Sequence, residues 1–396
     1  MGLFNRKKSS DDADNKKEKG AWRRPANTAF KQQRLKAWQP ILTPKTVLPT
    51  LFIIGILFAP IGGLLIWGSS LVTEMTFDYT ECERLSPSSD AANPNFSDLP
   101  SGKFSYRLRA KDDKSNPRTP RYAFIEDSSN PDVSQQKRCV VEFEIPNTLT
   151  HSVFFYYKLS NFFQNHRRYV KSLNSDQLKG KGVSANDLHN SDCKPLDTID
   201  GKPIYPCGLI ANSIFNDTFS NPVLLNTAGD SNASNMTYEF SSKGIAWPGE
   251  AKKYAAKPGY SDLSQIVPPP NWGARFPQGY NESNIPNLRE DEHFQNWMRT
   301  AGLPVFTKLY GRNDNNDMPK GIYRVTIGLN FPVLPYKGTK SFVISTVSWI
   351  GGKNPFLGWA YVAAAGVFVL LAILGTARHL IKPRRLGDMS LLSWNR

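Results

Sequence analysis

The chain has 396 residues with a formal net charge of +15 at pH 7, and 40% of its residues are hydrophobic. Aromatic residues make up 12% of the chain, a share that argues against global disorder. With four Cys, five His and no C-x-x-C motif, the sequence also argues against a structural zinc site.

Two long stretches without any charged residue lie near the two ends of the chain, at 46–73 and 354–377. Each exceeds the roughly 20 residues that a helix needs to cross a hydrocarbon core of about 30 Å. A mostly polar segment precedes the first stretch, which argues against a secretory signal peptide. We therefore predict two transmembrane helices.

The positive charges beside these spans predict their orientation. Eight Lys and Arg lie close to the spans on the sides toward the chain ends, and three lie in the matching central windows. Because cytosolic flanks carry the excess of Lys and Arg, both tails, 1–45 and 378–396, are predicted to be cytosolic. The segment 74–353 is then a luminal or extracellular ectodomain.

The ectodomain holds all four cysteines, Cys82, Cys139, Cys193 and Cys207. An even number of cysteines in an oxidising compartment indicates two disulfides, and the spacing leaves all three pairings open. All five N-x-S/T sequons also lie there, and we expect at least two of them to be glycosylated: Asn95, Asn216, Asn232, Asn235 and Asn281.

The excess positive charge belongs to the tails. The N-terminal tail has 12 basic and 4 acidic residues, whereas the ectodomain has 32 and 29. Seven bases and no acid lie between Lys19 and Lys45, interleaved with aromatic residues. This composition favours membrane lipids or the cytosolic face of a partner over nucleic acid, with a solvated basic linker as the alternative.

The ectodomain is predicted to be rich in antiparallel strands. Apolar and polar residues alternate at 104–108, 141–145 and 323–331, and two more apolar segments, 151–163 and 341–350, are strand candidates. Apolar residues at helical spacing predict one amphipathic helix over 290–301. The stretch 172–275 is rich in Asn, Ser, Gly and Pro, so we expect a long irregular arm that buries few apolar residues. The predicted class is an α+β membrane protein.

No catalytic motif is visible: there is no G-x-S-x-G elbow, no Walker loop and no H-E-x-x-H. Neither span carries an ionisable residue that could form an ion relay. Gly55, Ala59 and Gly63 recur every four residues and predict a small-residue face on the first helix, for packing on a partner or on the second helix. Pro60 is expected to kink this helix.

Five blocks of the sequence are long and unusual: NTAFKQQRLKAWQPILT at 27–43, LSNFFQNHRRYV at 159–170, PCGLIANSIFNDTF at 206–219, WMRTAGLPVFTKLYG at 297–311 and KSFVISTVSWIGGKNPFLG at 340–358. In these blocks the chain resembles the cell-division-cycle-50 (ligand-effect-modulator) family, the accessory subunits of type IV P-type ATPases that act as lipid flippases. In having four ectodomain cysteines, the chain resembles the fungal branch of this family.

The resemblance implies a non-catalytic subunit that binds a phospholipid-translocating ATPase and supports its folding, exit from the endoplasmic reticulum and activity. It also implies residence from the endoplasmic reticulum to the Golgi, endosome or plasma membrane, and the pairing Cys82–Cys139 and Cys193–Cys207. No cofactor or metal is implied. The tail residues Phe30, Arg34 and Trp38 would contact the ATPase on the cytosolic side.

Two other classes of protein remain open from the residues alone. One is a two-pass membrane receptor whose ectodomain binds a soluble ligand. The other is a carbohydrate-active or lipid-modifying enzyme whose site has no recognised motif.

Overall fold

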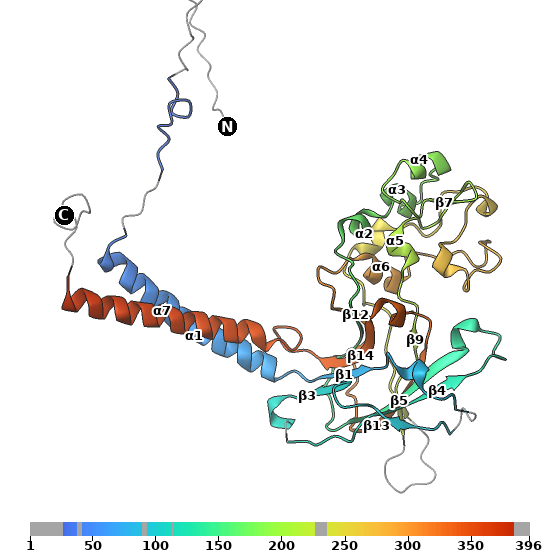
Figure 1. The fold of residues 1–396 in the computed structure, drawn as a ribbon, viewed down its shortest axis with the longest axis horizontal. Coiled ribbons are helices and arrows are strands. Elements are labelled where there is room, and N and C mark those ends of the chain that lie inside the picture. Colours follow the sequence, from blue (N-terminus) through green and yellow to red (C-terminus); the bar gives the residue numbers. More distant parts are fainter. Residues whose placement is uncertain (1–26, 38–41, 89–92, 113, 226–235, 384–396) are drawn as a thin grey trace, which may run out of the picture. The chain divides into compact units, whose positions relative to one another are not determined.

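A computed structural model describes residues 27–37, 42–88, 93–112, 114–225 and 236–383 (Figure 1). Contacts divide the chain into two compact units, Gly55–Val367 and a smaller one of Met1–Ile54 with Phe368–Arg396. Two long apolar helices, α1 (Pro44–Ser70) and α7 (Pro355–Ile381), have 27 residues each and are long and apolar enough to cross a membrane. Helix α1 continues through Pro60 without a break in its assignment.

The first sheet has five antiparallel strands and is connected directly to the two long helices. Its order is β12 (Phe306–Asn313), β6 (Val153–Ser160), β14 (Thr339–Thr346), β1 (Glu74–Asp78) and β3 (Phe104–Arg107). Strand β1 follows α1, β14 precedes α7, and the two strands pair with Glu74 opposite Ser345.

The second sheet is also antiparallel and is built around the pair β13 and β5. Its order is β11 (Met236–Thr237), β10 (Val223–Leu225), β13 (Gly321–Gly328), β5 (Lys137–Ile145), β4 (Arg121–Glu126) and β2 (Ser97–Asp98), with β9 (Thr218–Phe219) beside β13.

The two sheets pack face to face on an aromatic core. Phe77 of β1 lies 4.7 Å from Phe143 of β5 and 5.0 Å from Phe342 of β14 between ring centroids. All three side chains are at most 2% exposed. Alternation of apolar and polar residues along these strands supplies the inward faces, as in other sheet-on-sheet packings. The predicted α+β class with antiparallel sheets is confirmed.

The arm is irregular in backbone, as predicted, but the expectation that it buries few apolar residues is wrong. It follows α2 (Arg167–Lys171), contains α3 (Ser175–Leu178), α4 (Ala185–His189), α5 (Leu209–Asn212) and the short pair β7 (Thr198–Ile199) and β8 (Lys202–Pro203), and packs on α6 (Glu292–Met298). Trp272 and Trp297 are 4% and 0% exposed, and their indole N–H groups donate to the carbonyls of Ala211 and Ile210. The two indoles therefore bury a large area and also satisfy carbonyl groups of α5.

Three predicted elements are shorter in the structure. Strand β13 ends at Gly328, because the N–H groups of Asn330 and Phe331 donate to the Asp217 carboxylate at 2.6 Å instead of to a strand. Strand β6 ends at Ser160, before Asn161 at φ 56°. Helix α6 begins after Asp291, whose side chain accepts from the N–H of Phe294, and ends at Met298.

Candidate functional site

The two membrane helices meet through small residues, and of the predicted small-residue face only Gly55 is buried. Gly55 is buried, whereas Ala59 and Gly63 are exposed. A Cβ added to Gly62 would lie 2.8 Å from Val362 Cγ2, while one added to Gly63 would meet nothing within 4 Å. Gly62 is therefore the glycine that allows close approach of α7.

Buried small residues recur every seven residues along each helix. They are Gly55, Gly62 and Ser69 in α1, where Gly68 is also buried, and Gly358, Ala365 and Ala372 in α7. Gly358 approaches the backbone of α1 as closely as Gly62 approaches α7, with a built Cβ 3.0 Å from the Gly62 carbonyl oxygen. A seven-residue repeat is typical of left-handed helix pairs. The sequence contains this seven-residue repeat, but the four-residue spacing of Gly55, Ala59 and Gly63 does not reveal it.

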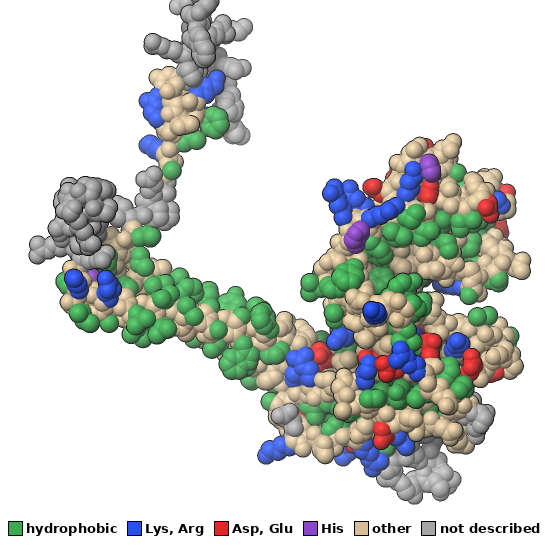
Figure 2. Space-filling view, in the orientation of Figure 1, with side chains coloured by type: hydrophobic (Ala, Val, Ile, Leu, Met, Phe, Trp, Pro, Cys, Tyr) green, Lys and Arg blue, Asp and Glu red, His purple; other side chains and the backbone are tan. Residues whose placement is uncertain are grey.

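Most of the surface of these helices is not covered by the rest of the chain. In the most apolar 18-residue stretch of each helix, only 17% is buried by the described residues. Side chains exposed by more than half include Ile56, Leu64 and Trp67 in α1, and Phe356 and Trp359 in α7. Figure 2 shows hydrophobic side chains along the helices. This surface is suited to lipid or to the membrane helices of a partner.

The helix pair is anchored to the first sheet by a set of hydrogen bonds at its base. The Lys353 ammonium donates to the carbonyls of Val72 and Leu108 at 2.8 Å each. The N–H of Thr346 donates to the carbonyl of Thr73 at 2.9 Å, and the N–H of Thr73 donates to Thr346 Oγ1 at 3.0 Å. These hydrogen bonds thus join the segment after α1 to the segment before α7 at the base of the ectodomain.

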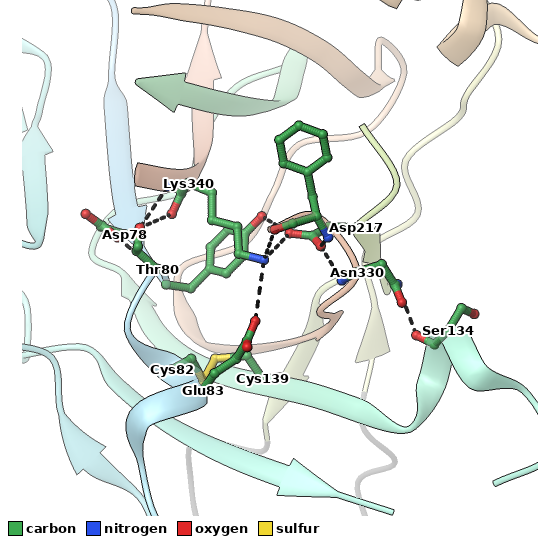
Figure 3. Close-up of polar contacts among 11 residues, drawn as sticks. Asp78, Thr80, Cys82, Glu83, Ser134, Cys139, Asp217, Asn330 and Lys340 are labelled. Carbon is green, nitrogen blue, oxygen red and sulfur yellow. Dashed lines mark hydrogen bonds and ion pairs between the residues drawn. A yellow bond between two sulfur atoms is a disulfide. The ribbon is translucent and has the colours of Figure 1, made fainter. Parts of the chain in front are cut away.

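A buried ion pair joins the first sheet to the loop before β9 (Figure 3). Lys340 Nζ lies 2.9 Å from Asp217 Oδ2, and the two residues are 1% and 2% exposed. The same ammonium donates to the Phe331 carbonyl at 2.9 Å, and Glu83 lies 4.0 Å away. The Tyr79 hydroxyl donates to Asp217 at 2.9 Å.

This cluster, defined by Lys340, Asp217 and Tyr79, is structural in character. Burial, with a further contribution from the Asp217 carboxylate, raises the pKa of Tyr79 well above its ordinary value, so the hydroxyl stays protonated and keeps donating. An ammonium surrounded by a carboxylate and a carbonyl satisfies the requirement that a buried charge be paired. Sequence reasoning missed the pair, because nothing local in either segment marks the two residues as neighbours.

The structure contains two disulfides, Cys82–Cys139 and Cys193–Cys207, the pairing implied by the resemblance. Cys82 and Cys139 are fully buried beside Glu83, whose carboxylate lies 4.0 Å from Lys340 Nζ (Figure 3). Cys193 and Cys207 form a small core with Leu188 and Ile204 in the arm.

Three predicted glycosylation sites lie among the described residues, and Asn95, Asn216 and Asn281 are all exposed. Asn232 and Asn235 lie outside the described residues, as does Trp38. In the tail, Phe30 is 75% exposed, and the Arg34 guanidinium donates to the side chain of Asn27. Phe30 and Arg34 thus lie at the surface of a local turn.

The ectodomain also has a basic recess of about 440 Å³. It is lined mainly by basic side chains: His166, Arg167, Arg168, Lys171 and Lys194. Among the residues that the structure describes, no group of three or more His, Cys, Asp or Glu could hold a metal ion. The basic side chains of this recess offer a surface for binding an anionic group.

Comparison with known proteins agrees with these features. The model of the LEM3 (ligand-effect modulator 3) family / CDC50 family matches residues 65–385. The phospholipid-transporting ATPase accessory subunit CRF1 of Saccharomyces cerevisiae is 44% identical over 395 residues, which cover 100% of this chain and 95% of that protein. The accessory subunit CDC50 of Chaetomium thermophilum is 42% identical over 94% of this chain and 91% of its own length.

The likeness extends beyond fungi. Cell cycle control protein 50A of Mus musculus is 38% identical over 362 residues, which cover 89% of this chain and 88% of that protein. With a family match over most of the chain and two long apolar helices that flank the ectodomain, this two-pass membrane protein belongs to the LEM3 (ligand-effect modulator 3) / CDC50 family.

Proposed function

We propose that this chain is the non-catalytic accessory subunit of a phospholipid-transporting ATPase of the type IV P-type class. The observation that carries the proposal is its full-length similarity to proteins named as accessory subunits of such ATPases. The apolar helix surface that the chain itself leaves uncovered supports a membrane partner.

In this proposal both tails are cytosolic and the ectodomain is luminal or extracellular. The excess of Lys and Arg beside the outer ends of the spans supports this orientation. The subunit accompanies its ATPase from the endoplasmic reticulum to the Golgi, endosome or plasma membrane and supports its folding and its movement of phospholipid to the cytoplasmic leaflet.

Two surfaces are proposed to contact the ATPase. One is the outward face of α1 with Ala59 and Gly63, where the absence of a large side chain at these positions allows close approach of a helix. The other is the tail with Phe30, Arg34 and Trp38, whose aromatic and basic groups suit an acidic cytosolic surface next to an anionic leaflet.

The test is purification of the tagged full-length chain from membranes in mild detergent. We expect an ATPase of the type IV class in near-equal amount, ATP-dependent transport of labelled phospholipid by the reconstituted complex, and none by the chain alone. Recovery of the chain without any such ATPase, together with capture of a soluble ligand, would favour the receptor alternative. ATP-dependent transport by the isolated chain would contradict the non-catalytic role.

A further inference from the structure

A cavity of about 570 Å³ is lined by residues of the arm, of α6 and of strands β6 and β12 of the first sheet. Its apolar walls are aromatic: Tyr157, Phe215, Trp272, Trp297 and Tyr310. Its polar lining includes Asn271, Arg275 and Asp291. Apolar walls with a few polar groups, in a space of this volume, are typical of sites that hold a small organic ligand. We call this space the aromatic cavity.

Asn216, the first residue of an N-x-T sequon, is itself part of the cavity lining and is exposed to solvent. Of the three described sequon asparagines, it alone lines this cavity, since Asn95 and Asn281 are absent from its walls. A sugar attached to Asn216 would therefore start at the mouth of the aromatic cavity.

The backbone on both sides of Asn216 is held firmly. The Phe215 ring stacks on Tyr157 with centroids 3.9 Å apart and planes 3° apart. On the other side, Asp217 is fixed by Lys340 and by the N–H groups of Asn330 and Phe331 (Figure 3). The attachment point thus has little freedom to move away from the cavity.

We propose that the N-linked glycan of Asn216 folds back into the aromatic cavity and that its inner N-acetylglucosamine residues occupy it. The C–H faces of the sugar rings match Val133, Ile214 and Tyr310, lining side chains that are not fully buried. The hydroxyl and acetamido groups match Asn271, Arg275 and Asp291 as hydrogen-bond partners. The inference rests on the luminal placement of the ectodomain, because only there would the glycan be added.

Covalent attachment makes this binding feasible without high intrinsic affinity. A group tethered by a short linker has an effective concentration on the order of millimolar at its site. Sugar–aromatic contacts that are too weak to hold a free saccharide are therefore sufficient for an attached one. The occupied cavity would connect the loop before β9 with the segment around Trp272 and with α6, so the glycan would brace the arm against α6.

The first experiment uses the unaltered full-length chain in complex with its ATPase, purified with high-mannose glycans. Endoglycosidase H is added under native conditions, and glycopeptide mapping follows each site with time. We expect the Asn216 glycan to be cleaved about tenfold more slowly than the Asn281 glycan, because a glycan bound most of the time is open to the enzyme only for the remaining fraction. After denaturation both sites should be cleaved equally.

Two variants separate protection by the cavity from other causes. Ala274 is exposed and lines the cavity, so Ala274→Trp would fill its mouth while leaving the sequon intact. We expect this variant to raise the cleavage rate at Asn216 to that at Asn281. Asn216→Gln should increase hydrogen exchange in 270–276 and lower the melting temperature, whereas the matched control Asn281→Gln should change neither.

The outcomes distinguish this inference from the proposed function. Occupied glycans at other sequons with an unmodified Asn216 would overturn the inference alone. Equal cleavage at Asn216 and Asn281 in the native complex would overturn it as well. If none of the sequons carries a glycan, the luminal orientation of the ectodomain is wrong.

Discussion

The helix pair and the ectodomain are held together in opposite ways. The ectodomain has two disulfides, a buried ion pair and an aromatic core in which residues such as Phe77, Phe342 and Trp297 are fully buried. The membrane helices contact each other through a narrow line of small residues and leave most of their surface uncovered. The ectodomain therefore contains the interactions that specify its own fold, whereas the helices have a large surface left for lipid or a partner.

The largest expected effect on this contrast comes from the buried ion pair. Asp217→Ala leaves the Lys340 ammonium without its carboxylate and should destabilise the ectodomain by about 3–5 kcal/mol. Thermal unfolding of the purified chain in detergent measures this change. The double variant Lys340→Met with Asp217→Leu should be less destabilised than Asp217→Ala, because it leaves no unpaired buried charge. Equal losses in the two variants would contradict the importance of pairing.

A smaller effect is expected between the membrane helices, where two neighbouring glycines form a matched pair. Gly62→Val should destabilise the helix pair by about 1–3 kcal/mol, since its side chain would collide with Val362 and the Gly358 carbonyl. Gly63→Val should leave the isolated chain unchanged and, under the proposed function, lower the yield of complex with the ATPase. Melting temperature of the chain and co-purification of the ATPase report these two effects separately.

The pair of glycines can also contradict the proposed contact surface. If Gly63→Val leaves the yield of complex at the level of the unaltered chain, the face with Ala59 and Gly63 is exposed to lipid alone. If Gly62→Val does not lower the melting temperature, the helices do not depend on this close approach.

A pH effect should appear in the ectodomain at α6. Burial lowers the pKa of His293, and the carboxylates of Asp291 and Glu292 only partly oppose this shift. Because the unfolded chain then binds a proton more readily, this contribution to stability is fully present above the ordinary pKa of about 6.5 and is lost as pH falls through the folded-state value. The melting temperature should therefore fall between pH 7.5 and 5.5, and less so in His293→Gln.

The control for this pH effect is His166, which is exposed. His166→Gln should keep the pH dependence of the unaltered chain. An identical pH dependence in His293→Gln would show that other groups are responsible.

The smallest effect is expected from the cytosolic tail. Arg34→Glu combined with Trp38→Ala should weaken co-purification of the ATPase by about fivefold, since each basic residue near an anionic leaflet contributes roughly 1 kcal/mol. The ectodomain should keep its melting temperature. An unchanged yield of complex would favour the view that the tail bases only set the orientation of the first span.

Features with a local signature could be predicted from the sequence. The two spans appear as uncharged stretches, and strands β3, β5 and β13 appear as alternating apolar residues. Helix α6 appears as apolar residues at helical spacing. Each of these depends on residues close together in the chain, so a single sequence carries the signal.

Features that depend on distant segments could not be predicted in this way. The partnership of Lys340 with Asp217 and the placement of the Trp272 indole on Ala211 require the tertiary fold to be known. The contact between Gly62 and Gly358 is intermediate, because each helix shows its seven-residue repeat but neither shows its partner. The sequence does not reveal how many apolar residues the arm buries, because its aromatic residues follow no regular period.

The hydrogen bonds at the base of the ectodomain have a mechanical consequence. Strand β1 follows α1, β14 precedes α7, and the two strands pair along the whole length of β1, from Glu74 opposite Ser345 to Asp78 opposite Ser341. Sliding one helix along the other by one residue would shift this register and turn every side chain of a strand to the opposite face of the sheet. The two membrane helices are therefore held in a fixed position along each other. A protein that changes conformation in the membrane beside them would move against a helix pair that does not slide.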